Sequence, residues 1–305
     1  MYPDIYSVQL DGFSSPMGIH TYGLMLLLAF GAAFLVAQNR VRRIGTNPDI
    51  MLPILGWAIL LGIVGSRVLH FVMAEPHLLL ADPLIVLKFN RGGMAFYGGV
   101  IAATFGCLWI AKKKGAHLWK FADATSPAIL VGLALGRLGC FAAGCCHGRV
   151  CDLPSASPIL TLPGGQIVSG EGFPWLALVF EPGVGVGNIH SVPVFPTQLW
   201  ESTGALLVFA LLSWMWAKKR RFDGQILGTL LILYPILRST IETFRGDTLR
   251  GVEHLGLFST SQLVSIPVAC LGLTILAIRS RHGLQPETPW VVSDDEMDEL
   301  LDDLD

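Results

Sequence analysis

The sequence predicts an all-α membrane protein with seven transmembrane helices, because three observations agree. The chain is 52% hydrophobic and only 14% charged, whereas soluble proteins carry about 25% charged residues. Seven stretches are apolar over roughly the 20 residues that a bilayer-spanning helix needs. Basic residues gather in alternate connections, as they do in membrane proteins of fixed orientation. This composition excludes a soluble globular protein, a disordered chain and a small disulfide scaffold, and nothing in it indicates nucleic-acid binding.

The expected helices follow one another along almost the whole chain. They cover roughly residues 17–38, 50–73, 93–111, 122–143, 198–217, 224–243 and 258–278. The first is expected to be retained, because no Lys or Arg precedes it and no small-residue cleavage site is evident. One set of connections holds 13 basic residues and the alternate set holds 5. This bias predicts an N-terminus outside the cell membrane and a cytoplasmic C-terminus.

Two segments are expected to lie outside the bilayer. Residues 1–283 should form one seven-helix domain, with a small external cap at about 144–197, between the fourth and fifth helices. That connection is rich in Gly, Pro and Ser and is long enough to fold by itself. Residues 284–305 should form an acidic cytoplasmic tail, since residues 285–305 contain nine Asp or Glu and no Lys or Arg. We assign the tail no chemistry.

Charged residues inside the expected spans are the first indication of function. They are Arg67, Arg137, Glu201, Arg238 and Glu242. A charge at the bilayer centre costs about 2.5–3.5 kcal/mol on insertion scales, so such residues are candidates for a functional site. The predicted topology places all of them in the outer half, at the depth where His20, Tyr22 and Tyr97 begin their helices. The alternative is that they are interfacial anchors, with Arg238 and Glu242 neutralising each other four residues apart.

Three arginines at one depth suit an anionic ligand. A guanidinium stays charged and offers paired donors to a phosphate or carboxylate. Glycine-rich stretches at 92–99 and 132–139 would let backbone approach a head group, although glycines also serve close helix packing. The residues alone therefore predict an outward-facing pocket for an anionic lipid or another amphiphilic anion.

Several motifs, in a fixed order along the chain, indicate a resemblance to a known protein family. The chain resembles the prolipoprotein diacylglyceryl transferases of bacterial inner membranes over residues 15–280. The motifs are IHTYG at 19–23, GGMAFYGG at 92–99, GRLGCF at 136–141 continuing to Gly148 and Arg149, PTQLWE at 196–201, and RSTIETFRGD at 238–247. The resemblance implies transfer of a diacylglyceryl group from phosphatidylglycerol to the lipobox cysteine of a prolipoprotein signal peptide. It implies no metal or organic cofactor, and a site that faces the outer leaflet of the bilayer.

The resemblance also implies roles for residues. Arg137 would bind the lipid phosphate, Arg238 would hold the phosphate or leaving group, and Glu242 would orient Arg238. Tyr97 occupies the position of a catalytic residue. The rest of the substrate pocket would be lined by His20, Tyr22, Gly98, Gly139, Gln198 and Glu201. Arg67 is a candidate only because of its expected depth.

Tyr97 is the first departure from the family, which carries histidine at this position. A tyrosine with its ordinary pKa near 10 is a poor base at neutral pH, whereas histidine is well suited. Three alternatives stay open. Tyr97 would only donate a hydrogen bond, the arginines would favour the acceptor thiolate through their charge, or His20 or Glu201 would take the proton.

The second departure is a group of cysteines where the family has asparagines and an acid. Cys140, Cys145, Cys146 and Cys151 lie within twelve residues, with His147 among them. They would form disulfides, pack as small apolar side chains, or bind metal, although the adjacent pair does not match the usual ligand spacing. An alternative function follows: a divergent paralogue that binds anionic lipid, or a membrane thiol protein built on Cys140–Cys151.

Overall fold

The computed structural model describes residues 4–8, 17–88, 93–153, 155–162, 165–170, 176–180, 192–245 and 259–284. The acidic tail from residue 285 lies outside these ranges. The chain divides into two compact units, one of Met1–Ala33 with Ser126–Leu284 and the other of Phe34–Thr125 with Gln285–Asp305. Each unit is described by itself. The boundaries fall inside two long helices, α1 (Thr21–Arg43) and α5 (Leu118–Ala142), which contribute to both units.

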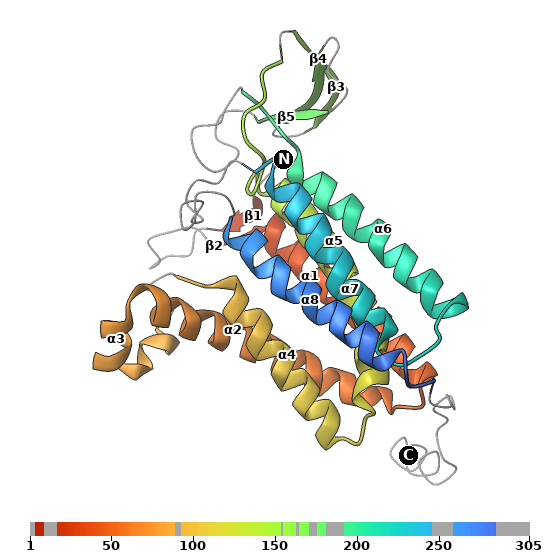
Figure 1. Cartoon of the computed structure of the whole chain (residues 1–305). Coiled ribbons are helices and arrows are strands. Elements are labelled where there is room, and N and C mark those ends of the chain that lie inside the picture. Colours follow the sequence, from red (N-terminus) through yellow and green to blue (C-terminus); the bar gives the residue numbers. More distant parts are fainter. Residues whose placement is uncertain are drawn as a thin grey trace, which may run out of the picture. The chain divides into compact units, whose positions relative to one another are not determined.

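The larger unit is built mainly from α5 and three later helices (Figure 1). These are α6 (Thr197–Lys218), α7 (Gln225–Glu242) and α8 (Thr260–Arg279). Ser259 and Gln262 form a reciprocal capping box that satisfies backbone donors at the start of α8. Gly224 precedes α7 with a φ of 96°, which a side chain would disfavour, and so permits the tight turn after α6.

Small and branched apolar residues form the core of this unit. Leu130 and Ala134 of α5 pack with residues of α6 and α7, which are Ala205, Leu212, Ile226 and Leu230. The hydroxyl of Ser202 donates to the carbonyl of Ala134 at 3.0 Å and ties α6 to α5. Close packing and hydrogen bonds between helices are the interactions that hold helices together in lipid, where burial from water gives no driving force.

The smaller unit centres on a pair of closely packed helices, α2 (Met51–Ala74) and α4 (Phe96–Lys113). The 3₁₀ turn η1 (Pro48–Ile50) precedes α2, and α3 (Pro76–Ala81) and the 3₁₀ turn η2 (Pro83–Leu87) follow it. Gly98 lies against Gly65, and a Cβ atom on Gly98 would be 2.3 Å from the carbonyl oxygen of Gly65. Gly98, expected to line the substrate pocket, thus has a packing role in this unit.

Arg67 has a structural role that its sequence position did not indicate. Its side chain is 2% exposed. Its Nε donates to the carbonyl of Val86 at 2.7 Å, and its Nη2 donates to that of Lys88 at 2.7 Å. These carbonyls belong to the irregular segment around η2, whose backbone acceptors need partners. Arg67 was a site candidate because of its expected depth, but in the structure its side chain holds the segment after α2.

The strands lie outside the long helices. β1 (Asp4–Val8) pairs antiparallel with β2 (Met17–His20). The first helix was predicted to begin at residue 17, but β2 occupies residues 17–20, so the helix begins only at Thr21. A four-stranded antiparallel sheet follows α5, in the order β3 (Ala156–Leu162), β4 (Gly165–Gly170), β5 (Ala177–Phe180) and β6 (Pro193–Val194). It lies in the connection where we expected an external cap.

Five helices of the described chain are long and apolar enough to cross a membrane. They are Thr21–Arg43, Pro48–Ala74, Leu118–Ala142, Thr197–Lys218 and Ser261–Arg279. Large apolar side chains on them are exposed, among them Leu27 at 68%, Leu35 at 64% and Leu207 at 67%. Such surfaces suit lipid rather than water. The structure therefore confirms a mostly helical membrane protein. α4 and α7 are each 18 residues long and carry two charges near their C-terminal ends.

The Gly98 contact gives a test of the α2–α4 packing. Gly98→Ala would place a methyl group against the Gly65 backbone, and relieving this clash should cost about 1–3 kcal/mol of stability. Thermal unfolding in detergent would show this as a lower Tm. Gly56→Ala is the matched control on α2, because nothing lies within 4 Å of its added Cβ. Equal Tm values for the two variants would contradict the packing described here.

Candidate functional site

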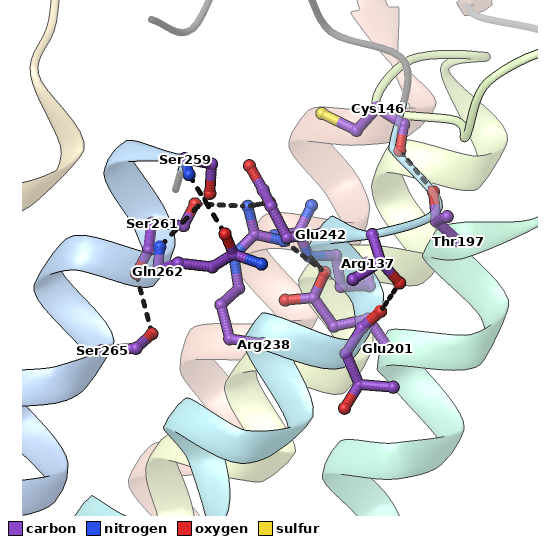
Figure 2. Close-up of polar contacts among 12 residues, drawn as sticks. Arg137, Cys146, Thr197, Glu201, Arg238, Glu242, Ser259, Ser261, Gln262 and Ser265 are labelled. Atoms are coloured by element: carbon purple, nitrogen blue, oxygen red, sulfur yellow. Dashed lines mark hydrogen bonds and ion pairs between the residues drawn. The ribbon is translucent and has the colours of Figure 1, made fainter. Parts of the chain in front are cut away.

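Four charged side chains form a continuous chain of ion pairs across three helices (Figure 2). Arg137 of α5 places its Nε 3.0 Å from Oε2 of Glu201 on α6. Nη1 of Arg238 on α7 lies 3.7 Å from the same oxygen, and its Nη2 lies 2.5 Å from Oε2 of Glu242. The charges alternate in sign and cancel, which is the condition for burying ionised groups.

The burial of these four side chains argues against the alternative that they are interfacial anchors. The side chain of Glu201 is 1% exposed, and those of Arg137, Arg238 and Glu242 are 16%, 11% and 13% exposed. Arg238 and Glu242 do pair with each other, as that alternative supposed. Arg238 also reaches Glu201 on α6, and its Nη2 donates to the hydroxyl of Ser261 on α8 at 3.2 Å. The pair thus belongs to a buried network that joins four helices.

The backbone after α5 forms a turn over this network, which we call the cysteine turn (residues 143–148). Figure 2 shows how Thr197 at the start of α6 holds it, since the hydroxyl donates to the carbonyl of Cys146 at 3.0 Å. The Gln198 amide donates to the carbonyl of Cys145 at 2.7 Å. Cys146 has a φ of 60°, in the left-handed region that residues other than glycine rarely adopt. The start of α6 therefore fixes an uncommon backbone conformation.

The end of α7 holds the cysteine turn from another direction. Gly148 forms a β-bridge with Arg245, just beyond α7, and donates its backbone N–H to the carbonyl of Phe195 at 2.8 Å. A Cβ atom on Gly148 would lie 2.5 Å from the Cβ of Phe195, so only glycine fits. The sequence predicted no role for Arg245 or Thr197, although they lie inside the motifs at 238–247 and 196–201.

Two buried oxygens beside the ion pairs have no donor. Oε1 of Gln198 and Oε1 of Glu201 are buried and accept no hydrogen bond from any described residue. Buried acceptors in native proteins are nearly always satisfied, so such a pair indicates a position for a ligand or water. Both residues were expected to line the substrate pocket, and the structure brings them to the same end of α6.

The structure also places Tyr22 and Gly139 together. A Cβ atom on Gly139 would lie 3.0 Å from the Cβ of Met25 and 3.3 Å from Cδ2 of Tyr22, so the glycine lets α1 approach α5. Tyr22 also lies within range of the positive charge of Arg137. His20 ends β2, but its side chain lies outside what is described. Tyr97 lies in the first turn of α4, in the smaller unit, which is described separately.

Three thiols converge beside the ion pairs. The sulfur atoms of Cys140, Cys145 and Cys146 all lie within 4.8 Å of one another. All six cysteines of the chain are free. Interactions among the three thiols lower the pKa of the Cys146 thiol and raise that of the Cys145 thiol, and the positive charges of Arg245 and Arg137 lower the pKa of Cys146 further. Cys151 lies elsewhere, in an apolar cluster with Val168 and Ala177.

Comparison with known proteins identifies the family of the chain. A profile of the family described as prolipoprotein diacylglyceryl transferase matches residues 12–278. Proteins named phosphatidylglycerol–prolipoprotein diacylglyceryl transferase are similar over most of their length. The one from Finegoldia magna is 32% identical, over 86% of this chain and 92% of its own. The one from Thermus thermophilus is 30% identical, over 86% and 94%. The one from Xylella fastidiosa is 28% identical, over 92% and 96%.

The chain belongs to the prolipoprotein diacylglyceryl transferase family. The family resemblance found from the sequence motifs is thereby confirmed. As a member of a transferase family with several apolar helices of spanning length, the protein is a multi-pass membrane enzyme. The roles that the resemblance gives to single residues stay predictions.

The shared carboxylate of Glu201 can be tested through stability. Glu201→Gln removes the charge that Arg137 and Arg238 share, and breaking a buried ion pair in this way should cost about 3–5 kcal/mol. Unfolding in mixed micelles with increasing dodecyl sulfate would measure the loss. Asp82→Asn is the control, because it breaks the exposed Asp82–Lys88 pair and should change little. A similar response from both variants would show that the buried network does not stabilise the protein.

Proposed function

We propose that this protein transfers the diacylglyceryl group of phosphatidylglycerol to the lipobox cysteine of prolipoproteins, the first step of lipoprotein maturation. The observation that carries the proposal is the buried chain of ion pairs in which Arg137 and Arg238 share Glu201. The family and the names of the relatives, which specify both substrates, support it. In this proposal the two arginines bind the lipid phosphate. The unsatisfied Oε1 atoms of Gln198 and Glu201 bind the glycerol head group.

In the proposed reaction, negative charge develops on a phosphate oxygen that Arg137 would stabilise. The acceptor sulfur attacks the glyceryl carbon that is bonded to the phosphate, and the carbon–oxygen bond breaks. The electron pair stays on the phosphate oxygen, and glycerol phosphate leaves with one more negative charge than the diester had. Arg137 uses its Nε for Glu201, and its two terminal nitrogens bond no described residue. Those nitrogens would donate to the phosphate oxygens as the charge develops.

The other residues of the network would position the lipid. Glu201 and Glu242 keep the two guanidiniums in place by ion pairs on either side of Arg238. The unsatisfied Oε1 atoms of Gln198 and Glu201 would accept hydrogen bonds from the glycerol hydroxyls of the head group. Tyr22, packed on Gly139, and His20 before it would line the same pocket. Gly98 stays a pocket residue on the family resemblance alone, and its contact in the structure is with Gly65 of α2.

The proposed location is the inner membrane of a bacterium, with seven spans, the N-terminus outside and the site facing the outer leaflet. The counts of 13 and 5 basic residues in alternate connections support this orientation. The site residues support it too. Arg137 and Glu242 lie near the ends of α5 and α7, whereas Glu201 and Ser261 lie near the starts of α6 and α8. Alternating helices place those ends on one side of a bilayer.

A second function is favoured by one observation, the three converging thiols. A divergent paralogue would bind anionic lipid without transferring it, or would work as a membrane thiol protein centred on Cys140–Cys151. Such a protein would lose its function when its cysteines are replaced and would tolerate replacement of Arg137.

Replacement of Arg137 tests the main proposal. Arg137→Ala should lower transfer by about 100-fold or more, the usual effect of removing a donor that stabilises developing charge. The purified protein would be mixed with phosphatidylglycerol vesicles and a lipobox peptide, and the peptide would be weighed by mass spectrometry. Lys219→Ala, a cation beyond the opposite end of α6, is the control and should transfer normally. Near-normal transfer by Arg137→Ala would remove the central assignment.

Tyr97 is proposed to donate a hydrogen bond to the lipid or the acceptor thiol. It is not proposed as the base that deprotonates the thiol. Tyr97→Phe should then lower transfer by no more than about tenfold, the value of one net hydrogen bond. The pH dependence of transfer should keep its shape, because no titrating group of the reaction is lost. The same mass-spectrometric assay over a range of pH would measure both quantities. Complete loss of transfer, or loss of one limb of the pH profile, would make Tyr97 the base.

A further inference from the structure

The three thiols of Cys140, Cys145 and Cys146 have the dimensions of a metal site. Tetrahedral zinc binds thiolates at about 2.3 Å, which puts ligand sulfurs about 3.8 Å apart. The three sulfurs already lie within 4.8 Å of one another. Only small side-chain rotations would bring them to a common ion. The spacing along the sequence spoke against metal because Cys145 and Cys146 are adjacent, but the turn brings both sulfurs to Cys140.

The backbone holds these thiols in place before any ligand arrives. The N–H of Cys145 donates to the carbonyl of Cys140 at 3.0 Å, which closes the turn after α5. Gln198 and Thr197 hold the carbonyls of Cys145 and Cys146 toward α6. In Figure 2 the sulfur of Cys146 points away from the carbonyl that Thr197 holds. The left-handed conformation of Cys146 is the kind of uncommon backbone that functional sites retain.

The surrounding charge suits a thiolate-bound cation. Three thiolates and one Zn²⁺ carry a net charge of −1. Arg137 and Arg245 both interact electrostatically with the Cys146 sulfur, and Arg137 also interacts with Cys140. These guanidiniums would offset the remaining negative charge, so that the site need not be neutral by itself.

The described residues supply three ligands, and zinc takes four. Within the described ranges no histidine or carboxylate joins the three cysteines in a possible ligand group. The nearby His147 directs its Nδ1 to the carbonyl of Gly148 at 2.9 Å. Zinc sites with three protein ligands leave the fourth position to water or substrate, and they are typically catalytic. A thiol is the natural occupant here, because the proposed acceptor is a cysteine.

We propose that Cys140, Cys145 and Cys146 bind Zn²⁺, and that the fourth ligand is the lipobox cysteine of the acceptor peptide. This inference rests on the proposed function and specifies how the acceptor thiol becomes reactive. The expectation that no metal is needed was based on the family, whose asparagines stand where this chain has cysteines. The zinc site would supply the thiolate that Tyr97, in place of the family's histidine, is poorly suited to produce.

The chemistry balances with zinc as the only addition. The acceptor thiol displaces a zinc-bound water and loses its proton to bulk water, because a coordinating thiol is deprotonated. The zinc-bound sulfur then attacks the glyceryl carbon of phosphatidylglycerol, and a carbon–sulfur bond replaces the carbon–oxygen bond. Glycerol phosphate leaves beside Arg137 with the electron pair. The product thioether is neutral and binds zinc weakly, so water displaces it.

Cobalt spectroscopy tests the site without relying on activity. The reduced full-length protein in detergent, freed of metal with a chelator, would be titrated with Co²⁺. Sulfur-to-cobalt charge-transfer absorption should appear at one ion per chain. A lipobox peptide should raise this absorption by about a third, because a fourth thiolate joins three. The same peptide with serine in place of cysteine should leave it unchanged. No charge-transfer absorption, no response to the cysteine peptide, or binding of Cu⁺ but not Zn²⁺ would overturn the inference.

Single substitutions identify the ligands. Cys146→Ser and Cys145→Ser should each weaken Zn²⁺ binding by at least about tenfold, within the range for altered metal sites. Cys270→Ser, an exposed cysteine on α8, is the matched control and should bind like the unaltered protein. Elution as a single species and an unchanged Tm would show that each variant is folded. Equal affinities in all three variants would place the metal elsewhere and refute the site.

Transfer assays separate this inference from the proposed function. Metal-free protein should transfer at least about tenfold more slowly than the same sample with Zn²⁺ restored. Full transfer by protein verified as metal-free would overturn the zinc inference and leave the proposed function intact. Absence of transfer under every condition, together with the expected cobalt spectra, would reject the proposed function while the zinc–thiol site stands.

Discussion

The shared carboxylate of Glu201 is the interaction on which the rest of the site depends. Two guanidiniums from different helices approach one almost fully buried oxygen, and Glu242 neutralises the second of them. Without that carboxylate, Arg137 and Arg238 would repel each other in a buried position, where an unpaired charge is costly. Neutralising the network internally lets α5, α6 and α7 pack around it, and it leaves the terminal nitrogens of Arg137 for a ligand.

The cysteine turn is the second constraint, and it depends on the same helices. The first residues of α6 hold the carbonyls of Cys145 and Cys146, and Glu201 lies one turn further along that helix. Gly148 joins the turn to Arg245 at the end of α7. A movement of α6 would therefore displace the ion pairs and the thiols together. This coupling explains how residues far apart in the sequence can serve one reaction: the proposed phosphate site and the proposed thiol site share a support.

Glycines set the distances between helices in both units. Gly139 lets Tyr22 of α1 lie against α5, and Gly98 lets α4 lie directly on α2. Both were expected to line the substrate pocket. Their packing explains why glycine is required there: any side chain would separate the helices and move the polar groups that they carry. The close packing of a helix at its glycine therefore also fixes the position of the polar residues on that helix.

The sequence by itself determined the helices and their family. Hydropathy is a local property of the chain, and the predicted spans at 198–217 and 224–243 differ from α6 and α7 by only one residue at each end. Arg137, Glu201, Arg238 and Glu242 could also be singled out as candidates, because charge in an apolar run is visible without coordinates. Their partners could not be identified in this way. Arg67 stood among the same candidates, yet it bonds the carbonyls of Val86 and Lys88 in an irregular segment that hydropathy does not detect. The convergence of Cys140, Cys145 and Cys146 was decided only by tertiary structure, because it depends on a left-handed residue that Thr197 and Gln198 hold in place, some fifty residues away along the chain.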